Sequence, residues 1–365
     1  MKIPQRFETI TPYEQGEALQ ALADRLGLSP GQIIKLDANE NPYGPSPLAV
    51  KALADLQFPN YYPDSDGLEL RAALSRFTGA PTENLMLGSG ADELIDLLLR
   101  AVLDPDDRVL ICPPAFSMYA LDTQLNFGKI LAVNRRPDFS HDVPAICSMV
   151  EQQRPKLLFI TSPNNPDGSL IDPADLDILL KLPVLVVLDE AYIEFVDDGG
   201  FLGENLSRIR RVSARENLIV LRTFSKWAGL AGLRIGFGAF PDWLIPVLWK
   251  VKPPYNNNVA AVSAALASLK DLDILAERVG WIKAERRRLY EALCRIPYLR
   301  PYSSQGNFIL CKVLGRAAAE LKNGLAERGI LVRLFDIPSL PNSLRIGVGR
   351  PQDTGRLIEA LENEA

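Results

Sequence analysis

Short apolar runs alternate with helical patterns along most of the chain. Five runs rich in Val, Ile and Leu predict strands: Arg108–Cys112, Leu157–Thr161, Val184–Asp189, Leu218–Thr223 and Arg234–Phe240. Most of them are continuously apolar at their centres, which is typical of strands that are covered on both faces. Strands that alternate with helices predict βαβ units, and therefore an α/β fold with a mostly parallel central sheet covered by helices.

The pattern also divides the chain into parts. After the arm Met1–Pro12, apolar residues at helical spacing predict a helix over Tyr13–Leu26, which ends at Gly27. Residues 1–30 are therefore an N-terminal arm and helix. The run Lys252-Pro253-Pro254 interrupts the chain again, and we expect a boundary near Tyr255. Residues 31–255 then form a large domain.

Residues 256–365 are predicted to form a smaller α+β domain. They begin with a long helical region over Val259–Arg295 and continue with three short strands at Asn307–Val313, Ile330–Arg333 and Ser343–Val348. A length of 365 residues agrees with two to three domains in total.

Charge and composition narrow the class of protein. The 40 Lys and Arg residues stand against 45 Asp and Glu residues, for a net charge of −5 without long blocks of either sign. This distribution indicates neither nucleic acid nor an anionic membrane as a partner, so we expect small-molecule partners. No apolar run approaches 18 residues, and Met1–Pro12 lacks the apolar segment of an export signal. We therefore expect a cytoplasmic protein that does not enter the membrane.

Cysteine usage also agrees with a cytoplasmic location, and histidine usage limits the metal sites that the chain can form. Four widely spaced cysteines without a CxxC pair predict free thiols, as in a reducing compartment. His141 is the only histidine, so a metal site built from several His ligands is excluded, and we predict no metal.

Polar, turn-rich segments follow four of the five predicted strands directly. In open parallel sheets this edge is where ligands bind. Asp189 ends a very apolar strand, and a carboxylate there needs a partner such as a cationic ring nitrogen or an arginine. Ser225-Lys226 follows another strand end. A lysine at such a place is either an ordinary surface residue or a desolvated amine with a lowered pKa that acts as a nucleophile.

Two other segments are candidates for binding. Gly88-Ser-Gly-Ala-Asp-Glu93 leads into the helical run Leu94–Val102, and is either an ordinary helix start or a phosphate site at a helix N-terminus. The turn-rich segment Asp37–Pro47 is a loop, and loops of this kind often carry function.

Taken in order, these motifs resemble a known family. Gly88–Glu93, Asn164-Asn-Pro-Asp-Gly168, Asp189-Glu-Ala-Tyr192 and the spacing Ser-Lys226-x7-Arg234 are similar to fold-type I enzymes of pyridoxal 5′-phosphate (PLP), the aspartate aminotransferase superfamily. The closer resemblance, over nearly the whole chain, is to the histidinol-phosphate aminotransferases. It rests on further segments: Thr11-Pro-Tyr13, Leu36-Asp-Ala-Asn-Glu-Asn-Pro42, Tyr62-Pro-Asp64, Leu221-Arg-Thr-Phe-Ser-Lys226 and Ala231-Gly-Leu-Arg234. The run Ala228–Gly238 looks most like plant and cyanobacterial members.

The resemblance implies PLP as the cofactor and gives its binding residues. Lys226 would hold PLP covalently and move the Cα proton of the substrate, and Asp189 would pair with the pyridinium nitrogen. Asn165 and Tyr192 would bind the ring hydroxyl, and Phe116 would stack on the ring or simply be a core aromatic. The phosphate would be held by Ala91, Asp92, Thr223, Ser225 and Arg234. Tyr62 would reach the phosphate from the neighbouring subunit, which implies a homodimer.

The resemblance also implies the substrates. L-Histidinol phosphate and 2-oxoglutarate would give imidazole acetol phosphate and glutamate, a step of histidine biosynthesis. Histidinol phosphate has a phosphate ester where other amino acids have their α-carboxylate, so two arginines, Arg333 and Arg345, would bind it. Either could instead be a solvated or paired arginine of an edge strand. Tyr13, Asn39 and Glu40 would contact the imidazole.

Three other functions stay open at this point. A threonine-phosphate decarboxylase of the same fold shares several of these segments, and a broad-specificity aromatic aminotransferase would use the same cofactor residues. A non-catalytic regulator with the PLP fold is the third, although it would not need Lys226, Asp189 and both substrate arginines.

Overall fold

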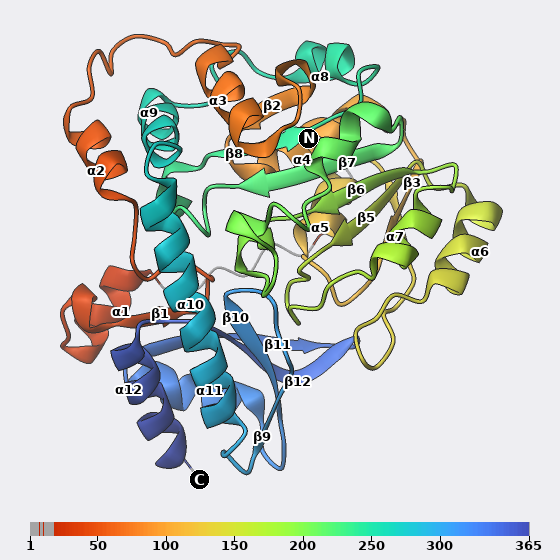
Figure 1. Cartoon of the computed structure of the whole chain (residues 1–365). Coiled ribbons are helices and arrows are strands. Elements are labelled where there is room, and N and C mark those ends of the chain that lie inside the picture. The colour runs from red at the N-terminus through yellow and green to blue at the C-terminus, as the bar shows by residue number, and fades with distance from the viewer. Residues whose placement is uncertain (1–6, 8–9, 11–17, 365) are drawn as a thin grey trace, which may run out of the picture.

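A computed structural model describes residues 7, 10 and 18–364, which fold around two sheets (Figure 1). The larger sheet has seven strands in the order β2-β8-β7-β6-β5-β3-β4. In chain order these strands are β2 Leu85–Gly88, β3 Arg108–Ile111, β4 Lys129–Ala132, β5 Leu157–Thr161, β6 Leu185–Asp189, β7 Leu218–Thr223 and β8 Gly236–Ala239. All five strands predicted for this region are present, and β2 and β4 are additional.

The larger sheet is mixed. Strands β7, β6, β5, β3 and β4 are parallel neighbours, whereas β8 is antiparallel to both β2 and β7. The connection 224–235 contains no α-helix to carry the chain across the sheet, so β8 returns antiparallel beside β7. The carboxyl ends of β3, β5, β6 and β7 therefore meet at one edge, as predicted.

Helices cover both faces of this sheet. They are α3 Leu68–Thr78, α4 Gly90–Val102, α5 Met118–Leu125, α6 Val143–Gln153, α7 Pro173–Leu179 and α8 Ile245–Val251. Strand β7 shows why both faces are apolar: Val220 belongs to one core cluster, and Ile219 and Leu221 belong to the cluster on the other face. Alternate residues of a strand point to opposite faces, so a strand buried on both sides must be apolar throughout.

The smaller sheet has the order β1-β11-β12-β10-β9 and lies in the lower part of Figure 1. Its strands are β1 Ile34–Leu36, β9 Leu299–Pro301, β10 Phe308–Val313, β11 Ile330–Ile337 and β12 Leu340–Gly347. Helices α10 Leu272–Leu293, α11 Ala318–Glu327 and α12 Pro351–Glu362 accompany it. Strand β1 pairs in parallel with β11, so residues 34–36 join the smaller sheet, although the sequence groups them with the large domain.

Three helices remain. Helix α1 Leu19–Leu26 ends at Gly27, whose φ of 66° is the left-handed conformation expected of a glycine C-cap. The earlier part of the predicted helix, residues 13–17, lies outside the described residues. Helix α2 Pro47–Ala54 packs against α9 Val259–Ser268, which with α10 forms the long predicted helical region. Within the described residues, no helix combines the length and the apolar character needed to span a bilayer.

Candidate active site

Ten of the residues predicted to hold the cofactor line one cavity of about 120 Å³ at the carboxyl edge of the larger sheet. They are Ala91, Asp92, Phe116, Asn165, Asp189, Tyr192, Thr223, Ser225, Lys226 and Arg234. The end of β5 adds Thr161 to the lining, and Ala191 follows β6. Sequence reasoning missed these two residues, although Thr161 is the last residue of a strand that it predicted.

Asp189 lies at the floor of this cavity and is 4% exposed. Its Oδ1 accepts a hydrogen bond from the Ala191 N–H, and its Oδ2 accepts one from the Tyr119 hydroxyl at 2.6 Å. Burial raises the pKa of Asp189 to about 6, and these two hydrogen bonds act in the opposite direction. A carboxylate that is held out of water in this way favours a cationic partner.

Tyr119 is a site residue that the sequence analysis did not identify. It lies in the first turn of α5, three residues after Phe116, and its ring packs edge-on against the Phe116 ring at 5.6 Å between centroids. Its hydroxyl also lies 2.8 Å from Thr161 Oγ1. Phe116 precedes α5, so no helical spacing from it marked Tyr119 in advance.

Lys226 follows β7 and is half-buried. Its Nζ donates a hydrogen bond to the Ala38 carbonyl oxygen at 3.0 Å. The pKa of Lys226 is lowered to about 8, mainly by desolvation and secondly by the positive charge of Arg345. A substantial fraction of this amine is therefore neutral near pH 7 to 8, which is the form that attacks a carbonyl group.

The N-terminus of α4 forms one wall of the cavity. Helix α4 begins at Gly90, and its unpaired backbone N–H groups and dipole favour an anion at Ala91 and Asp92. Arg234 adds a cation there and forms an ion pair with Asp92, with 2.7 Å between Nη2 and Oδ2. A Cβ added to Gly90, whose φ is +81°, would lie 2.6 Å from Arg234 Nη2. The chain thus provides an anion site in the cavity that Lys226 also lines.

A further group of polar side chains contacts the lining of the cavity. Asn39 Nδ2 donates to the Tyr192 hydroxyl at 3.2 Å, and Asn165 Oδ1 accepts from Arg345 Nη1 at 2.6 Å. Asn39 is buried in a left-handed conformation with a φ of +54°, and its Oδ1 makes no hydrogen bond within the described part of the chain. These contacts tie the lining residues Tyr192 and Asn165 to Asn39 and Arg345.

The two predicted substrate arginines are direct neighbours on the smaller sheet. Arg333 of β11 is the Cα partner of Arg345 of β12. Arg345 is 6% exposed, donates to the Asp37 carbonyl oxygen at 2.5 Å, and has its guanidinium 5.5 Å from the centre of the Phe308 ring. Arg333 is half-buried. The sheet register therefore brings two cations together, and the charge of one of them, Arg345, acts on the Lys226 amine.

Three other residues predicted to bind substrate or cofactor are not among the described residues that line this cavity. Glu40 forms an ion pair with Lys35, with 2.9 Å between Nζ and Oε2. Tyr13 lies outside the described residues. Tyr62 does not line the cavity of its own chain; it is 81% exposed and stacks on Tyr255 with 4.6 Å between ring centres.

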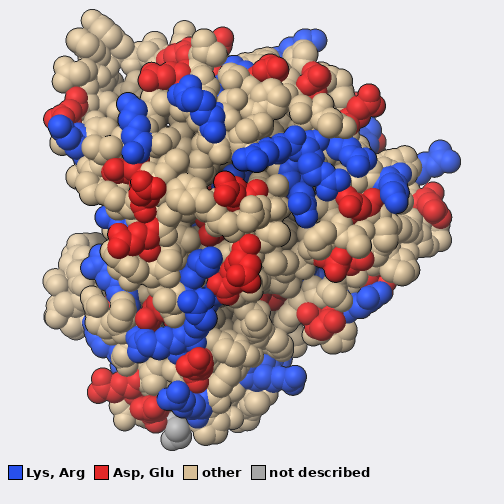
Figure 2. Space-filling model, in the orientation of Figure 1, with Lys and Arg blue, Asp and Glu red and all other residues tan. Residues whose placement is uncertain are grey.

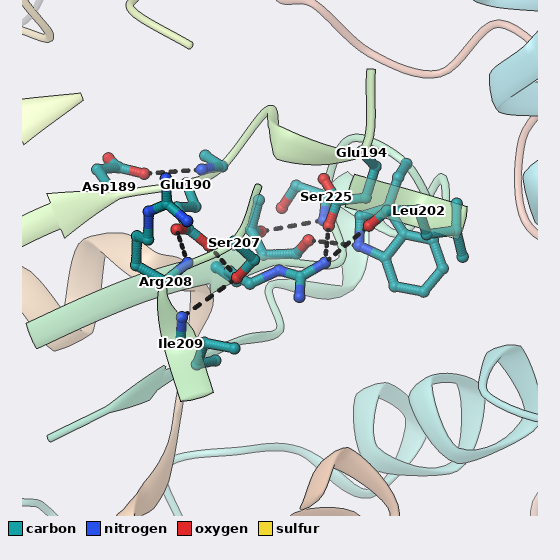
Figure 3. Close-up of polar contacts among 12 residues, drawn as sticks. Asp189, Glu190, Glu194, Leu202, Ser207, Arg208, Ile209 and Ser225 are labelled. Carbon is teal, nitrogen blue, oxygen red and sulfur yellow. Dashed lines mark hydrogen bonds and ion pairs between the residues drawn. The ribbon is translucent and has the colours of Figure 1, made fainter. Parts of the chain in front are cut away.

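A buried polar network lies next to the strand ends that carry Asp189 and Thr223 (Figure 3). Glu190 accepts hydrogen bonds from the Ser207 hydroxyl and, at 2.7 Å, from the Arg208 N–H. Glu194 forms a fully buried ion pair with Arg222, with 2.7 Å between Oε1 and Nη2. Removing one member of such a pair leaves an uncompensated buried charge, so this network fixes the strand ends.

The predictions on cysteine, histidine and metal concern residues outside this cavity. Cys112, Cys147, Cys294 and Cys311 are free thiols. His141 is buried, and desolvation together with the Arg135 charge lowers its pKa to about 3. Across residues 18–364, no cluster of three or more His, Cys, Asp or Glu side chains has the spacing of a metal site.

Comparison with known proteins agrees with this geometry. Residues 31–361 match the family model of the class I and II aminotransferases. The chain is 47% identical over 355 residues to the chloroplastic histidinol-phosphate aminotransferase of Nicotiana tabacum, covering 97% of this chain and 84% of that protein. It is 48% identical over 364 residues to the histidinol-phosphate aminotransferase of Roseiflexus castenholzii, covering 98% and 96%.

Solved structures show the same similarity. The histidinol-phosphate aminotransferase of Sinorhizobium meliloti in complex with pyridoxal-5′-phosphate superposes with a TM-score of 0.88 at 25% identity, over 100% of this chain and 98% of that chain. An aspartate aminotransferase of Thermus thermophilus has the same fold, with a TM-score of 0.81 at 20% identity over the whole of both chains. The fold is thus that of the PLP-dependent fold-type I enzymes, as predicted. The chain belongs to the class I and II aminotransferases and, within them, to the histidinol-phosphate aminotransferase family.

Proposed function

We propose that this chain transfers the amino group of L-histidinol phosphate to 2-oxoglutarate with PLP as cofactor, giving imidazole acetol phosphate and glutamate. The observation that carries the proposal is the cavity in which Lys226, Asp189 and the α4 N-terminus converge, with Arg345 bound to its lining residue Asn165 and Arg333 paired with Arg345 across the sheet. The curated relatives cited above, at 47–48% identity, carry this activity in their names.

The residues of the cavity fit PLP group by group. The backbone N–H groups at Ala91 and Asp92, with Arg234, would hold the phosphate, and Thr223 and Ser225 would add hydroxyl groups. Asp189 would bind the protonated ring nitrogen, which would also neutralise its buried charge. Asn165 and Tyr192 would bind the ring hydroxyl, and Phe116 would cover the ring. When bound, PLP supplies an electron sink for the carbanion formed at the substrate Cα.

The chain itself supplies the proton chemistry and the orientation. Lys226 would attach the cofactor through Nζ and, once displaced by the substrate amine, take the Cα proton with the same nitrogen. Its lowered pKa makes the neutral base available near pH 8. Asp189 would keep the ring nitrogen protonated, because its carboxylate is desolvated and is held by Tyr119 and Ala191.

The arginine pair would select the substrate. A dianionic phosphate ester is bound better by two guanidinium groups than by one, whereas an α-carboxylate carries a single charge. Arg345 would also keep its contact with Asn165, so the substrate site and the cofactor site share a residue. Tyr13, Asn39 and Glu40 remain proposed contacts of the imidazole.

We also propose that the active enzyme is a homodimer. The segment before α3 exposes three aromatic side chains, Phe58 at 62%, Tyr61 at 65% and Tyr62 at 81%. Three exposed aromatic side chains so close together in the chain favour an interface, and Tyr62 would then reach the partner's cofactor phosphate.

A hybrid of Tyr62→Ala and Lys226→Ala chains would contain one intact site if Tyr62 acts across the interface. Random mixing should then restore about a quarter of wild-type activity; no restoration would contradict the proposal. A cytoplasmic location stays a prediction.

A panel of amino donors tests the proposed reaction. The holoenzyme should convert 2-oxoglutarate to glutamate rapidly with histidinol phosphate, and slowly with histidinol or with aromatic amino acids. Threonine phosphate should release no CO2. Fast CO2 release from threonine phosphate would favour the decarboxylase, equal rates with aromatic amino acids would favour the broad aminotransferase, and no turnover of any donor would favour the regulator.

A further inference from the structure

A second cavity lies behind the larger sheet, near the buried network of Figure 3. Its volume is about 180 Å³, and we name it the Arg222 cavity. Its lining comes from the end of α3, the segment 201–210, β7 and the start of α10. The lining residues are Arg76, Phe77, Thr78, Phe201, Leu202, Glu204, Ser207, Ile209, Arg210, Arg222 and Leu272.

The Arg222 cavity is distinct from the proposed cofactor site. The two cavities share no lining residue. Arg222 and Thr223 are consecutive residues of β7, and consecutive side chains of a strand point to opposite faces of the sheet. Thr223 lines the cofactor cavity, whereas Arg222 lines the cavity behind it. A ligand in the Arg222 cavity would therefore leave the cofactor site open.

Arginine side chains give this cavity its charge. Arg222 is 2% exposed; its Nη2 binds Glu194, and its Nε makes no hydrogen bond within the described residues. The Nε of Arg210 donates to the Thr78 carbonyl oxygen at 2.7 Å, which fixes the guanidinium at the rim. The Arg222 charge is matched by Glu194. The other charged lining residues are the cations Arg76 and Arg210 and the single carboxylate of Glu204, so cations outnumber anions in the lining. Lys and Arg side chains also gather over β6 and β7 in the view of Figure 2.

The rest of the lining is apolar. Phe77, Leu202, Ile209 and Leu272 provide hydrocarbon surface, with Phe201 at the rim. An apolar protein cavity of about 150 Å³ is large enough to hold benzene, so a cavity of about 180 Å³ can hold a single ring or a short branched chain. The cavity thus combines space for one small apolar group with an excess of arginine.

From this combination we propose that the Arg222 cavity binds a small organic carboxylate, with the apolar part against Phe77 and Leu202 and the carboxylate against Arg76 and Arg210. The proposal does not depend on the aminotransferase reaction, since it uses none of the residues assigned to it. Ser207, which lines the cavity, is hydrogen-bonded to Glu190, the neighbour of Asp189. A ligand there would contact the network that holds the catalytic strand ends.

Calorimetric titration of the holoenzyme with benzoate tests the proposal. We expect saturable binding of benzoate, at least tenfold weaker binding of the uncharged benzamide, and at least tenfold weaker binding of inorganic phosphate, which lacks the apolar group. Arg210→Ala should weaken benzoate binding by about tenfold or more and should keep aminotransferase activity. Arg211→Ala is the matched control, because Arg211 pairs with Asp177 and does not line the cavity.

Benzoate could also bind the arginine pair of the proposed active site, and Arg333→Ala separates the two sites. Benzoate affinity that survives Arg333→Ala and falls in Arg210→Ala supports the Arg222 cavity. Affinity that falls in Arg333→Ala and survives Arg210→Ala overturns the proposal, as does an absence of saturable benzoate binding up to millimolar concentrations. Phosphate binding as strong as benzoate binding would overturn the assignment to an organic carboxylate.

Discussion

The Tyr119 hydroxyl donates a hydrogen bond to Asp189 Oδ2 at 2.6 Å, inside a region where both side chains are almost fully buried. Thr161 Oγ1 lies 2.8 Å from the same hydroxyl. Tyr119 therefore holds the carboxylate that we assign to the ring nitrogen of PLP, and it does so from the first turn of α5, directly after the loop that carries Phe116. This makes Tyr119 a positioning residue that acts through Asp189.

Tyr119→Phe should lower kcat by about tenfold or more, because a hydrogen bond to a charged group contributes about 1.5–3 kcal/mol. The hydroxyl stabilises the ionised form of Asp189, so its removal raises the pKa of Asp189. The acid limb of the pH–rate profile should therefore move to higher pH. Tyr290→Phe on α10, which does not line the cofactor cavity, serves as the control. A rate loss with an unmoved acid limb would mean that Tyr119 acts only through packing.

The covalent attachment of PLP to Lys226 should depend on pH in a defined way. The neutral amine is the reactive form, and its fraction rises with pH until the pKa of about 8 is passed. The attachment rate of the apoenzyme should therefore increase about tenfold per pH unit between pH 6 and 7.5, and level off above about 8. Stopped-flow absorbance measures this rate. A rate that continues to rise to pH 10 would show that Lys226 keeps the ordinary pKa of a lysine.

Gly236 tests the anion site at the start of α4. A Cβ at Gly236 would lie 2.6 Å from the Ala91 nitrogen and 2.7 Å from the Gly90 carbonyl carbon, both backbone atoms. Gly236→Ala should therefore displace the α4 N-terminus and weaken PLP binding by about 5- to 150-fold, as expected for 1–3 kcal/mol of overpacking. Gly232→Ala is the matched control, because no atom lies within 4 Å of its added Cβ. Equal PLP affinity in both variants would place the phosphate elsewhere.

Arg333 tests how the substrate phosphate is bound. Truncating one partner of a buried charge pair costs about 2–5 kcal/mol, so Arg333→Ala should lower kcat/KM for histidinol phosphate by roughly 30-fold to several thousand-fold. Glutamate, whose α-carboxylate carries one charge, should lose less. Arg300→Ala, an exposed arginine on β9, is the control. Equal losses for both amino donors would remove the assignment of Arg333 to phosphate selection.

Much of the cofactor site could be predicted from the sequence because it is built from strand ends. An apolar run that stops at a polar residue, as at Asp189 and Thr223, predicts a strand and the residue at which it ends. The last side chain of such a strand then lies at the carboxyl edge of the sheet. Parallel pairing then brings these ends together without further information. Asp189 and Lys226 were expected in the cavity for this reason, whereas the resemblance to the family supplied most of its other residues.

The residues that were missed depend on contacts between distant segments. Strand β1 is three residues long, and its pairing with β11 links residues about 300 positions apart, which no local pattern reveals. The antiparallel direction of β8 follows from the absence of a crossover helix, whereas its apolar character resembles that of its parallel neighbours. Tyr119 is an aromatic on a short helix, and only the position of Asp189 shows what its hydroxyl does.

Transfer of a labelled amino group tests the central assignment most directly. Holoenzyme is incubated with histidinol phosphate that carries ¹⁵N in its amino group, together with unlabelled 2-oxoglutarate, and the products are analysed by mass spectrometry. We expect one ¹⁵N-labelled glutamate for each molecule of histidinol phosphate consumed with the wild-type chain, and none with Lys226→Ala. Consumption of histidinol phosphate with the label released as ammonia, or labelled glutamate formed equally well by Lys226→Ala, would contradict amino transfer at this lysine.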